Sequence, residues 1–162
     1  MVFISLGSNL GDSRKLILDA MARLQKLSSK PILRSSLWRT SPVDCPPGSP
    51  EFINAIVGLV SKRTETPESL LKKLQKLEKE FGRKPKKILN APRPLDLDII
   101  TFGEELRDTK KLTLPHPRAH LRRFVLEPLF EVAPDLVLPG QGKSVAQLLA
   151  GLFFDEALVK LD

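Results

Sequence analysis

The chain contains one cysteine, Cys45, and no tyrosine, and none of its apolar runs approaches the roughly 20 residues of a membrane-spanning helix. A single cysteine excludes an internal disulfide and is typical of a protein that works in a reducing cytoplasm. Residues 1–12 have neither a basic segment nor a long apolar segment, so we expect no secretory signal there. These absences predict a cytoplasmic protein without a membrane partner.

What is present is typical of a globular protein. The 162 residues are 41% apolar and 28% charged, which predicts one domain over residues 1–162. The formal net charge is +7, and the densest basic run is 83–87. This excess has two interpretations: a polyanionic partner such as a nucleotide or nucleic acid, or a charge that only keeps the protein in solution.

Four segments have a clear local pattern. Residues 2–6 and 52–61 are rich in β-branched and aromatic residues, and the second alternates two faces, which predicts strands. A helix is expected after a cap at residues 12–13. Another is expected from Thr66, a cap followed by Pro67, to a stop at Gly82. Both carry an apolar stripe at helical spacing.

The rest of the chain is predicted from composition and punctuation. The expected elements are a turn at 7–11, a strand over 32–40, loops at 41–50 and 83–94, a strand from Asp96, an extended piece at 112–115, a helix from Pro117 to about Glu131 broken at Pro128, and a last helix at 144–152 that completes the chain. The order β-α-β-β-α-β is the split βαβ pattern of a ferredoxin-like α+β fold with a mainly antiparallel sheet.

Two aspartates, Asp96 and Asp98, begin one of these strands. Side chains two apart on a strand share a face, so the two carboxylates repel unless a cation lies between them. One or two Mg²⁺ ions fit, because Mg²⁺ takes a few carboxylates and completes its shell with phosphates and water. The alternative is an edge strand with an ordinary polar face, and spacing alone does not separate the two. Arg93 and the basic loop before the pair favour phosphoryl transfer, whereas a Walker A sequence is absent.

Several blocks together resemble a known family. They read ISLGSNLGD, RTSPVDCPPGSPEFINAIV, LEKEFGRK, APRPLDLDII and LTLPHPRAHLRRFVLEPLFEVAPDL, in this order over nearly the whole chain. The resemblance is to 6-hydroxymethyl-7,8-dihydropterin pyrophosphokinase of folate biosynthesis. It implies a ferredoxin-like α+β fold, with helices on both faces of a mainly antiparallel sheet. It also implies a monomeric enzyme that transfers the terminal pyrophosphate of ATP to the pterin hydroxymethyl group and releases AMP.

The resemblance also implies roles for individual residues. Asp96 and Asp98 match the pair that binds two Mg²⁺ ions, and Arg83 and Arg93 match two catalytic-loop arginines. The remaining positions on the ATP side are Gln75, Glu78, Lys111, Thr113, His116 and Arg122, with both arginines above also contacting ATP. The pterin pocket involves Thr40, Val43, Phe52, Asn54 and Phe124; two aromatic rings suit a flat ligand, and an amide suits its edge. Taken without the family, the two phenylalanines are more simply core residues.

Some positions depart from the family pattern. Leu89, Asn90 and Ala91 stand where many relatives have Arg-Trp-Gly, and Pro85 replaces a second arginine. Phe52 replaces a common tyrosine, and Lys111 a common arginine. These changes concern how the loops close over the substrates more than the metal pair.

Two other classes of function remain open. A nucleic-acid-binding module of ferredoxin-like fold is compatible with the positive charge, but the chain lacks the aromatic-rich segments on which such modules stack bases. A catalytically inactive relative is the second, and intact Asp96, Asp98, Arg93 and His116 argue against it. We therefore expect ATP and the pterin as partners, and no nucleic acid.

Overall fold

The computed structural model describes residues 1–40, 50–82, 94–152 and 158–161. Its centre is an antiparallel sheet with the strand order β5-β1-β4-β3-β8, in which a short strand β2 also pairs with β4. The strands are β1 (Val2–Ser8), β2 (Leu33–Arg34), β3 (Trp38–Thr40), β4 (Phe52–Leu59), β5 (Asp96–Phe102) and β8 (Leu158–Lys160). A separate two-stranded sheet joins β6 (Arg107–Asp108) to β7 (Thr113–Leu114).

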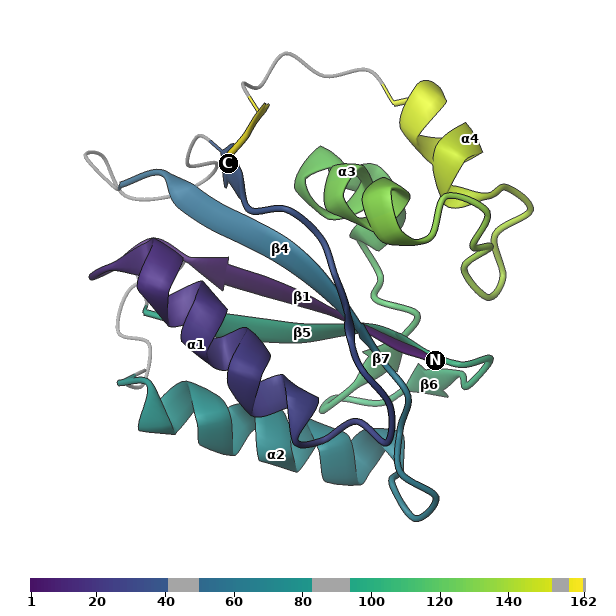
Figure 1. Cartoon of the computed structure of the whole chain (residues 1–162). Helices are drawn as coiled ribbons and strands as arrows, with labels where there is room; N and C mark the ends of the chain where they lie inside the picture. Colours follow the sequence, from purple (N-terminus) through teal and green to yellow (C-terminus); the bar gives the residue numbers. More distant parts are fainter. Residues whose placement is uncertain (41–49, 83–93, 153–157, 162) are drawn as a thin grey trace.

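Helices cover both faces of the main sheet (Figure 1). On one face lie α1 (Ser13–Gln25) and α2 (Pro67–Glu80), and on the other α3 (Arg123–Val132) and α4 (Val145–Ala150). A single-turn 3-10 helix, Ala119–Leu121, precedes α3. The predicted α+β fold, with helices on both faces of a mainly antiparallel sheet, is therefore confirmed.

The caps expected for α1 and α2 are present. Asp12 accepts a hydrogen bond from the backbone of Lys15 at the start of α1. Thr66 and Ser69 form a reciprocal capping box at the start of α2. After α2, Gly82 has a φ of +97°, the left-handed conformation that glycine adopts without strain.

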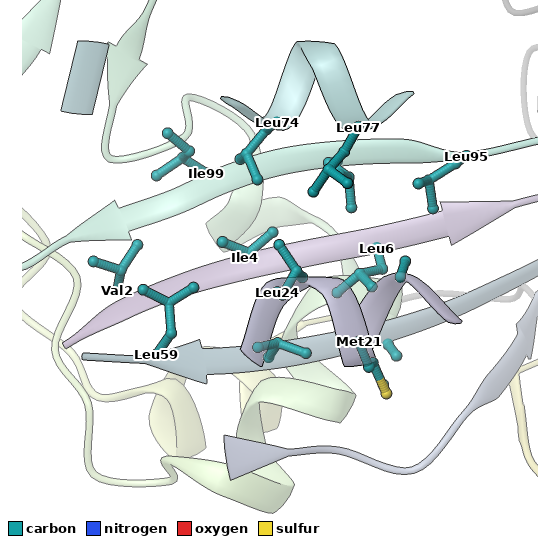
Figure 2. Close-up of a cluster of buried hydrophobic side chains, with 14 of the residues drawn as sticks. Val2, Ile4, Leu6, Met21, Leu24, Leu59, Leu74, Leu77, Leu95 and Ile99 are labelled. Atoms are coloured by element: carbon teal, nitrogen blue, oxygen red, sulfur yellow. The ribbon is translucent and has the colours of Figure 1, made fainter. Parts of the chain in front are cut away.

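The core between the sheet and α1 and α2 arises from the alternation of the strands. Figure 2 shows Ile4 and Leu6 of β1 facing Leu24 of α1 and Leu74 and Leu77 of α2. A second cluster lies on the opposite face, where α3 and α4 cover Phe3, Ile56 and Ile100. Alternate residues of β1 and β4 thus enter different clusters, so both faces of these central strands are buried.

Several expectations are corrected by the structure. The turn expected at 7–11 begins later, because β1 continues through Ser8 and pairs on both sides. The strand expected over 32–40 is two short strands with a break between them. The helix expected from Pro117 is the 3-10 turn followed by α3, and Pro128 lies inside α3. Pro128 is buried, and its packing offsets the hydrogen bond that proline cannot donate.

The last helix does not complete the chain. α4 begins at the Ser144 cap as expected, but β8 follows it and pairs with β3, Trp38 with Lys160 and Thr40 with Leu158. In the described ranges no helix has both the length and the apolar character to cross a bilayer.

Candidate active site

Asp96 and Asp98 lie at the start of β5, an edge strand of the sheet. Both are half-buried, whereas Leu95, Leu97 and Ile99 are 0–4% exposed and belong to the core beneath α2. The two residues are two positions apart on the strand, so their backbone atoms lie about 6.5 to 7 Å from each other. The predicted shared face is therefore confirmed, and the strand beneath the carboxylates is anchored by its buried residues.

The strand register aligns the aspartate pair with part of the predicted pterin pocket. Gly7 of β1 pairs with Asp96 on one side and with Asn54 of β4 on the other. Directly paired residues share a face, so Asp96 and Asn54 lie two strand spacings apart, about 10 Å, with Gly7 between them. This row of three residues joins the two halves of the predicted site.

Gly7 is a candidate site residue that the sequence reasoning missed. A methyl group on its Cα would lie 3.2 Å from Asn54 Oδ1 and 3.8 Å from a ring carbon of Phe52. Both side chains therefore lie directly over this glycine. A glycine inside a strand signals such a close approach. The signal is present in the sequence only if the first strand is extended through residue 8, as it is in the structure.

Thr40 and Asn54, which are both predicted for the pterin pocket, lie in contact. Both are buried, and the Asn54 side-chain amide donates a hydrogen bond of 3.0 Å to the Thr40 hydroxyl. This bond identifies the amide nitrogen and turns Oδ1 toward Gly7. Phe52 is half-buried beside them on the same strand face.

His116 lies beside β5, close to the aspartate pair. Its backbone N–H donates to the carbonyl of Ile100 at 2.8 Å, and its Nδ1 accepts from the backbone N–H of Arg118 at 3.2 Å. Burial, followed by the charges of Arg122 and Arg118, lowers the pKa of His116 to about 4, although Asp96 acts in the opposite direction. The imidazole is therefore neutral near pH 7, and its hydrogen is on Nε2.

Arg122 and Phe124 lie next to each other at the start of α3. The guanidinium carbon of Arg122 is 5.4 Å from the centre of the Phe124 ring, a cation–π distance. Phe124 also packs against the second core cluster. This contact orients a cation near the face of the sheet that carries Asp96.

The other residues predicted for the ATP side are more scattered. Glu78 is 8% exposed, and its Oε2 accepts a hydrogen bond of 2.8 Å from the backbone N–H of Leu97. Gln75, also on α2, is exposed. Thr113 is half-buried on β7, which lies beside β5, and Lys111 is exposed in the turn before it. The remaining three predicted residues, Val43, Arg83 and Arg93, fall outside the described residues, as do the departures at 85 and 89–91.

The aspartate pair fits a divalent cation whose shell is completed by a substrate. The part of the chain that the structure describes holds no group of three or more His, Cys, Asp or Glu side chains arranged for a metal. Two carboxylates on one strand are hard oxygen ligands, which suit Mg²⁺ bound together with phosphates and water. A closed structural metal site, by contrast, requires more protein ligands than the pair supplies.

A cavity of about 400 Å³ lies at the opposite end of β1 and β5, between Met1, Thr66, Phe102 and Arg107. None of the predicted site residues lines it. The chemistry inferred from the sequence therefore belongs to the end of the sheet that carries Asp96 and Asn54.

The model of the family described as 7,8-dihydro-6-hydroxymethylpterin-pyrophosphokinase (HPPK) matches residues 3–134, which include the aspartate pair, His116 and Phe124. The chain belongs to the HPPK family. The predicted family, fold and enzyme class are thereby confirmed, and with them the predicted reaction, pyrophosphoryl transfer in folate biosynthesis.

Relatives agree with this membership. The chain is 40% identical over 157 residues to 2-amino-4-hydroxy-6-hydroxymethyldihydropteridine pyrophosphokinase of Pseudomonas aeruginosa, covering 95% of this chain and 93% of that protein. It is 41% identical over 145 residues to the folic acid synthesis protein fol1 of Pneumocystis carinii, covering 90% of this chain and 19% of fol1. The chain thus corresponds to one part of the longer fol1 protein.

Solved structures show the same fold at low identity. A crystal structure of Plasmodium falciparum HPPK-DHPS with pteroate matches with a TM-score of 0.66 at 14% identity. The match covers 92% of this chain and 42% of the Plasmodium chain. At this identity the likeness concerns the fold of the HPPK part alone.

Proposed function

We propose that this HPPK-family chain transfers the terminal pyrophosphoryl group of ATP to the hydroxymethyl oxygen of 6-hydroxymethyl-7,8-dihydropterin and releases AMP. The observation that carries the proposal is the row Asp96–Gly7–Asn54. It brings a carboxylate pair suited to Mg²⁺ and an amide suited to a pterin edge onto one face, about 10 Å apart. That spacing suits two substrates that meet above the sheet, with the reacting atoms between the two ends of the row.

On the ATP side, Asp96 and Asp98 hold two Mg²⁺ ions together with the phosphates. Bound there, the ions would neutralise the charge of the phosphates. His116 contributes a neutral Nε2–H donor to a phosphate oxygen, and Arg122, held against Phe124, contributes a cation. The other ATP contacts in the proposal are Gln75, Lys111 and Thr113, with Arg83 and Arg93 from the loop outside the described residues.

On the pterin side, the flat ring lies between Phe52 and Phe124. Asn54 offers hydrogen bonds to the ring edge, and Thr40 holds the amide in its orientation. Val43 completes the pocket, as the family resemblance implies. Gly7 leaves the space for these side chains, because a methyl group at this position would press on Asn54 Oδ1 and would already be in contact with Phe52.

We also propose that the chain works as a monomer in the cytoplasm, with these two substrates as its partners and without nucleic acid. The support is the family resemblance and the single cysteine, which suits a reducing compartment. Light scattering during gel filtration tests the oligomeric state, and a dimer would contradict it.

The test of the reaction is a nucleotide product assay. With ATP, Mg²⁺ and the pterin we expect AMP, and no AMP when the pterin is left out. Asp96→Ala is expected to lose at least about a hundredfold in rate, because the phosphate charge is then no longer neutralised in place. Asp19→Ala, which removes an exposed carboxylate of α1 on the opposite face, is the matched control and is expected to retain activity.

The products decide between the alternatives. ADP in place of AMP would mean ordinary kinase chemistry and would contradict the proposal. AMP formation that survives in Asp96→Ala would remove the carboxylate pair from the mechanism.

A further inference from the structure

Glu78 carries a buried carboxylate that contacts the strand of the aspartate pair from behind. It lies near the end of α2, 8% exposed, and its Oε2 is 2.8 Å from the backbone nitrogen of Leu97. A carboxylate is costly to bury, so a buried one that accepts a hydrogen bond from the main chain holds that main chain strongly. The peptide that Glu78 holds joins Asp96 to Leu97, the residue between the two aspartates.

This hydrogen bond is made at the outer edge of the sheet. β5 is the last strand in the order β5-β1-β4-β3-β8, so its inner edge pairs with β1 and its outer edge faces α2 and β7. At this edge, the carboxylate of Glu78 accepts a hydrogen bond from the backbone N–H of Leu97. The backbone N–H of His116 donates a hydrogen bond to the carbonyl of Ile100, also at 2.8 Å. The two bonds bracket Asp98 on the side of β5 that pairs with no strand of the main sheet among the described residues.

The side chain of Leu97 reinforces the same anchoring. It is 4% exposed and belongs to the core cluster that also contains Leu74 and Leu77 of α2. Helix α2 therefore holds residue 97 twice, through its side chain in the core and through its backbone at Glu78. A shift of this residue would tilt both neighbouring carboxylates, because they extend from the opposite face of the strand.

We propose that Glu78 is a positioning residue for the divalent-cation site: it acts through the Leu97 peptide to fix the geometry of Asp96 and Asp98, and not by touching the nucleotide. The inference rests on the proposed function of the pair and deepens it. It replaces the nucleotide contact that the family resemblance implies for Glu78. Removing a residue that holds a metal ligand in place commonly lowers metal affinity or activity by about 10–100-fold.

The experiment separates Mg²⁺ from nucleotide. In Glu78→Ala, the Mg²⁺ concentration at half-maximal AMP formation is expected to rise about 10–100-fold. Binding of ATP in excess EDTA, measured by calorimetry, is expected to stay within about twofold of wild type, since a factor of two is under 0.5 kcal/mol. Glu78→Gln keeps a side-chain oxygen that can accept the Leu97 N–H, so it is expected to restore most of the Mg²⁺ affinity.

A second measurement does not depend on activity. Hydrogen exchange of the Leu97 amide in the full chain, followed by NMR, is expected to be at least about tenfold faster in Glu78→Ala than in wild type and near wild type in Glu78→Gln. Glu80→Ala is the matched control, because it removes an exposed carboxylate two residues along α2 that pairs with Arg23. That variant is expected to change neither Leu97 exchange nor the Mg²⁺ dependence.

The outcomes are distinguishable. Weaker ATP binding in EDTA together with unchanged Mg²⁺ dependence would overturn the inference and return Glu78 to the nucleotide. Unchanged Leu97 exchange in Glu78→Ala would also overturn it. If Glu78→Ala does not fold, the Mg²⁺ dependence of Glu78→Gln is compared with that of wild type. Because Gln can still accept the Leu97 N–H, a rise of more than about tenfold in the Mg²⁺ concentration at half-maximal AMP formation would count against positioning through this hydrogen bond. A wild-type chain that forms no AMP would contradict the proposed function, whereas Leu97 exchange and Mg²⁺ titration of the free protein still test the role of Glu78.

Discussion

The imidazole of His116 lies among groups that all bear on its protonation. Its Nδ1 accepts a backbone hydrogen bond, Arg118 and Arg122 repel a positive charge, and much of the ring is buried. These effects outweigh the attraction of Asp96 and hold the pKa at about 4, below the ordinary 6.5. Because the folded-state pKa is the lower one, the neutral ring stabilises the fold fully above pH 6.5, and this stabilisation is lost as the pH falls toward 4.

We therefore expect the ring resonances of His116 in the free protein to stay constant from pH 8 to pH 6 and to titrate near pH 4. Heteronuclear NMR of the imidazole groups measures this, and His116→Gln assigns the signal by its disappearance. A midpoint near 6.5 would contradict the prediction and would mean that an imidazolium meets the phosphates at neutral pH.

At the scale of elements, Glu131 connects α3 to the far edge of the sheet. Its carboxylate accepts hydrogen bonds from the Trp38 indole at 2.6 Å and from the Ser36 hydroxyl at 2.8 Å, and Lys160 of β8 lies 3.5 Å away. Burial opposes its ionisation, but the hydrogen bonds from Trp38 and Ser36 and the charge of Lys160 together hold its pKa below 4.5. One side chain thus joins α3, β3 and β8, three elements that are far apart in the sequence.

Replacing this carboxylate should destabilise the protein in a pH-dependent way. Glu131→Gln is expected to lower the free energy of unfolding by about 1 to 2 kcal/mol at pH 7, because the acceptor is then uncharged and offers one oxygen where the carboxylate offers two. Since the folded-state pKa is depressed, the difference from wild type is present above pH 4.5 and shrinks as the pH falls below it.

Urea unfolding of both proteins at several pH values measures the difference. Glu80→Gln, which weakens an exposed ion pair, is the control and is expected to change stability by less than about 1 kcal/mol. A difference between wild type and Glu131→Gln that stays constant from pH 7 to pH 3 would contradict the role of the charge.

At the scale of the whole molecule, two core clusters lie on opposite faces of one sheet. β1 and β4 contribute to both, Ile4 to the cluster under α1 and α2 and Phe3 to the cluster under α3 and α4. Because β1 and β4 contribute to both clusters, neither layer of helices can bury its apolar side without the shared sheet. We therefore propose that the chain folds as one domain.

We expect Leu74→Ala and Leu129→Ala, one in each cluster, to lower the free energy of unfolding by about 2 to 5 kcal/mol each. Both variants should still unfold in one transition, observed at the same urea concentration by Trp38 fluorescence and by circular dichroism. Two separated transitions would contradict the prediction of a single domain over residues 1–162.

Much of the site could be predicted from sequence because its signals are local. The Asp-Leu-Asp alternation placed both carboxylates on one face, and the alternation of β4 placed Phe52 and Asn54 together on another strand. The cap at Thr66 and the glycine at 82 bounded α2, whose stripe oriented Leu74 and Leu77 inward. Each of these patterns depends on residues within a few positions of one another, which is the range over which strand and helix periodicity act.

The tertiary structure decided what depends on contacts between distant segments. The register of β1 between β4 and β5 made Gly7 the link between Asp96 and Asn54. Packing kept Pro128 inside α3, and pairing with β3 ordered β8. The sequence by itself determined the family, the helices α1 and α2 and the aspartate pair, because local propensity and motif spacing specify them. Only the fold decided that Glu78 contacts the strand from behind, because a hydrogen bond between α2 and β5 exists only after both have packed on the same core.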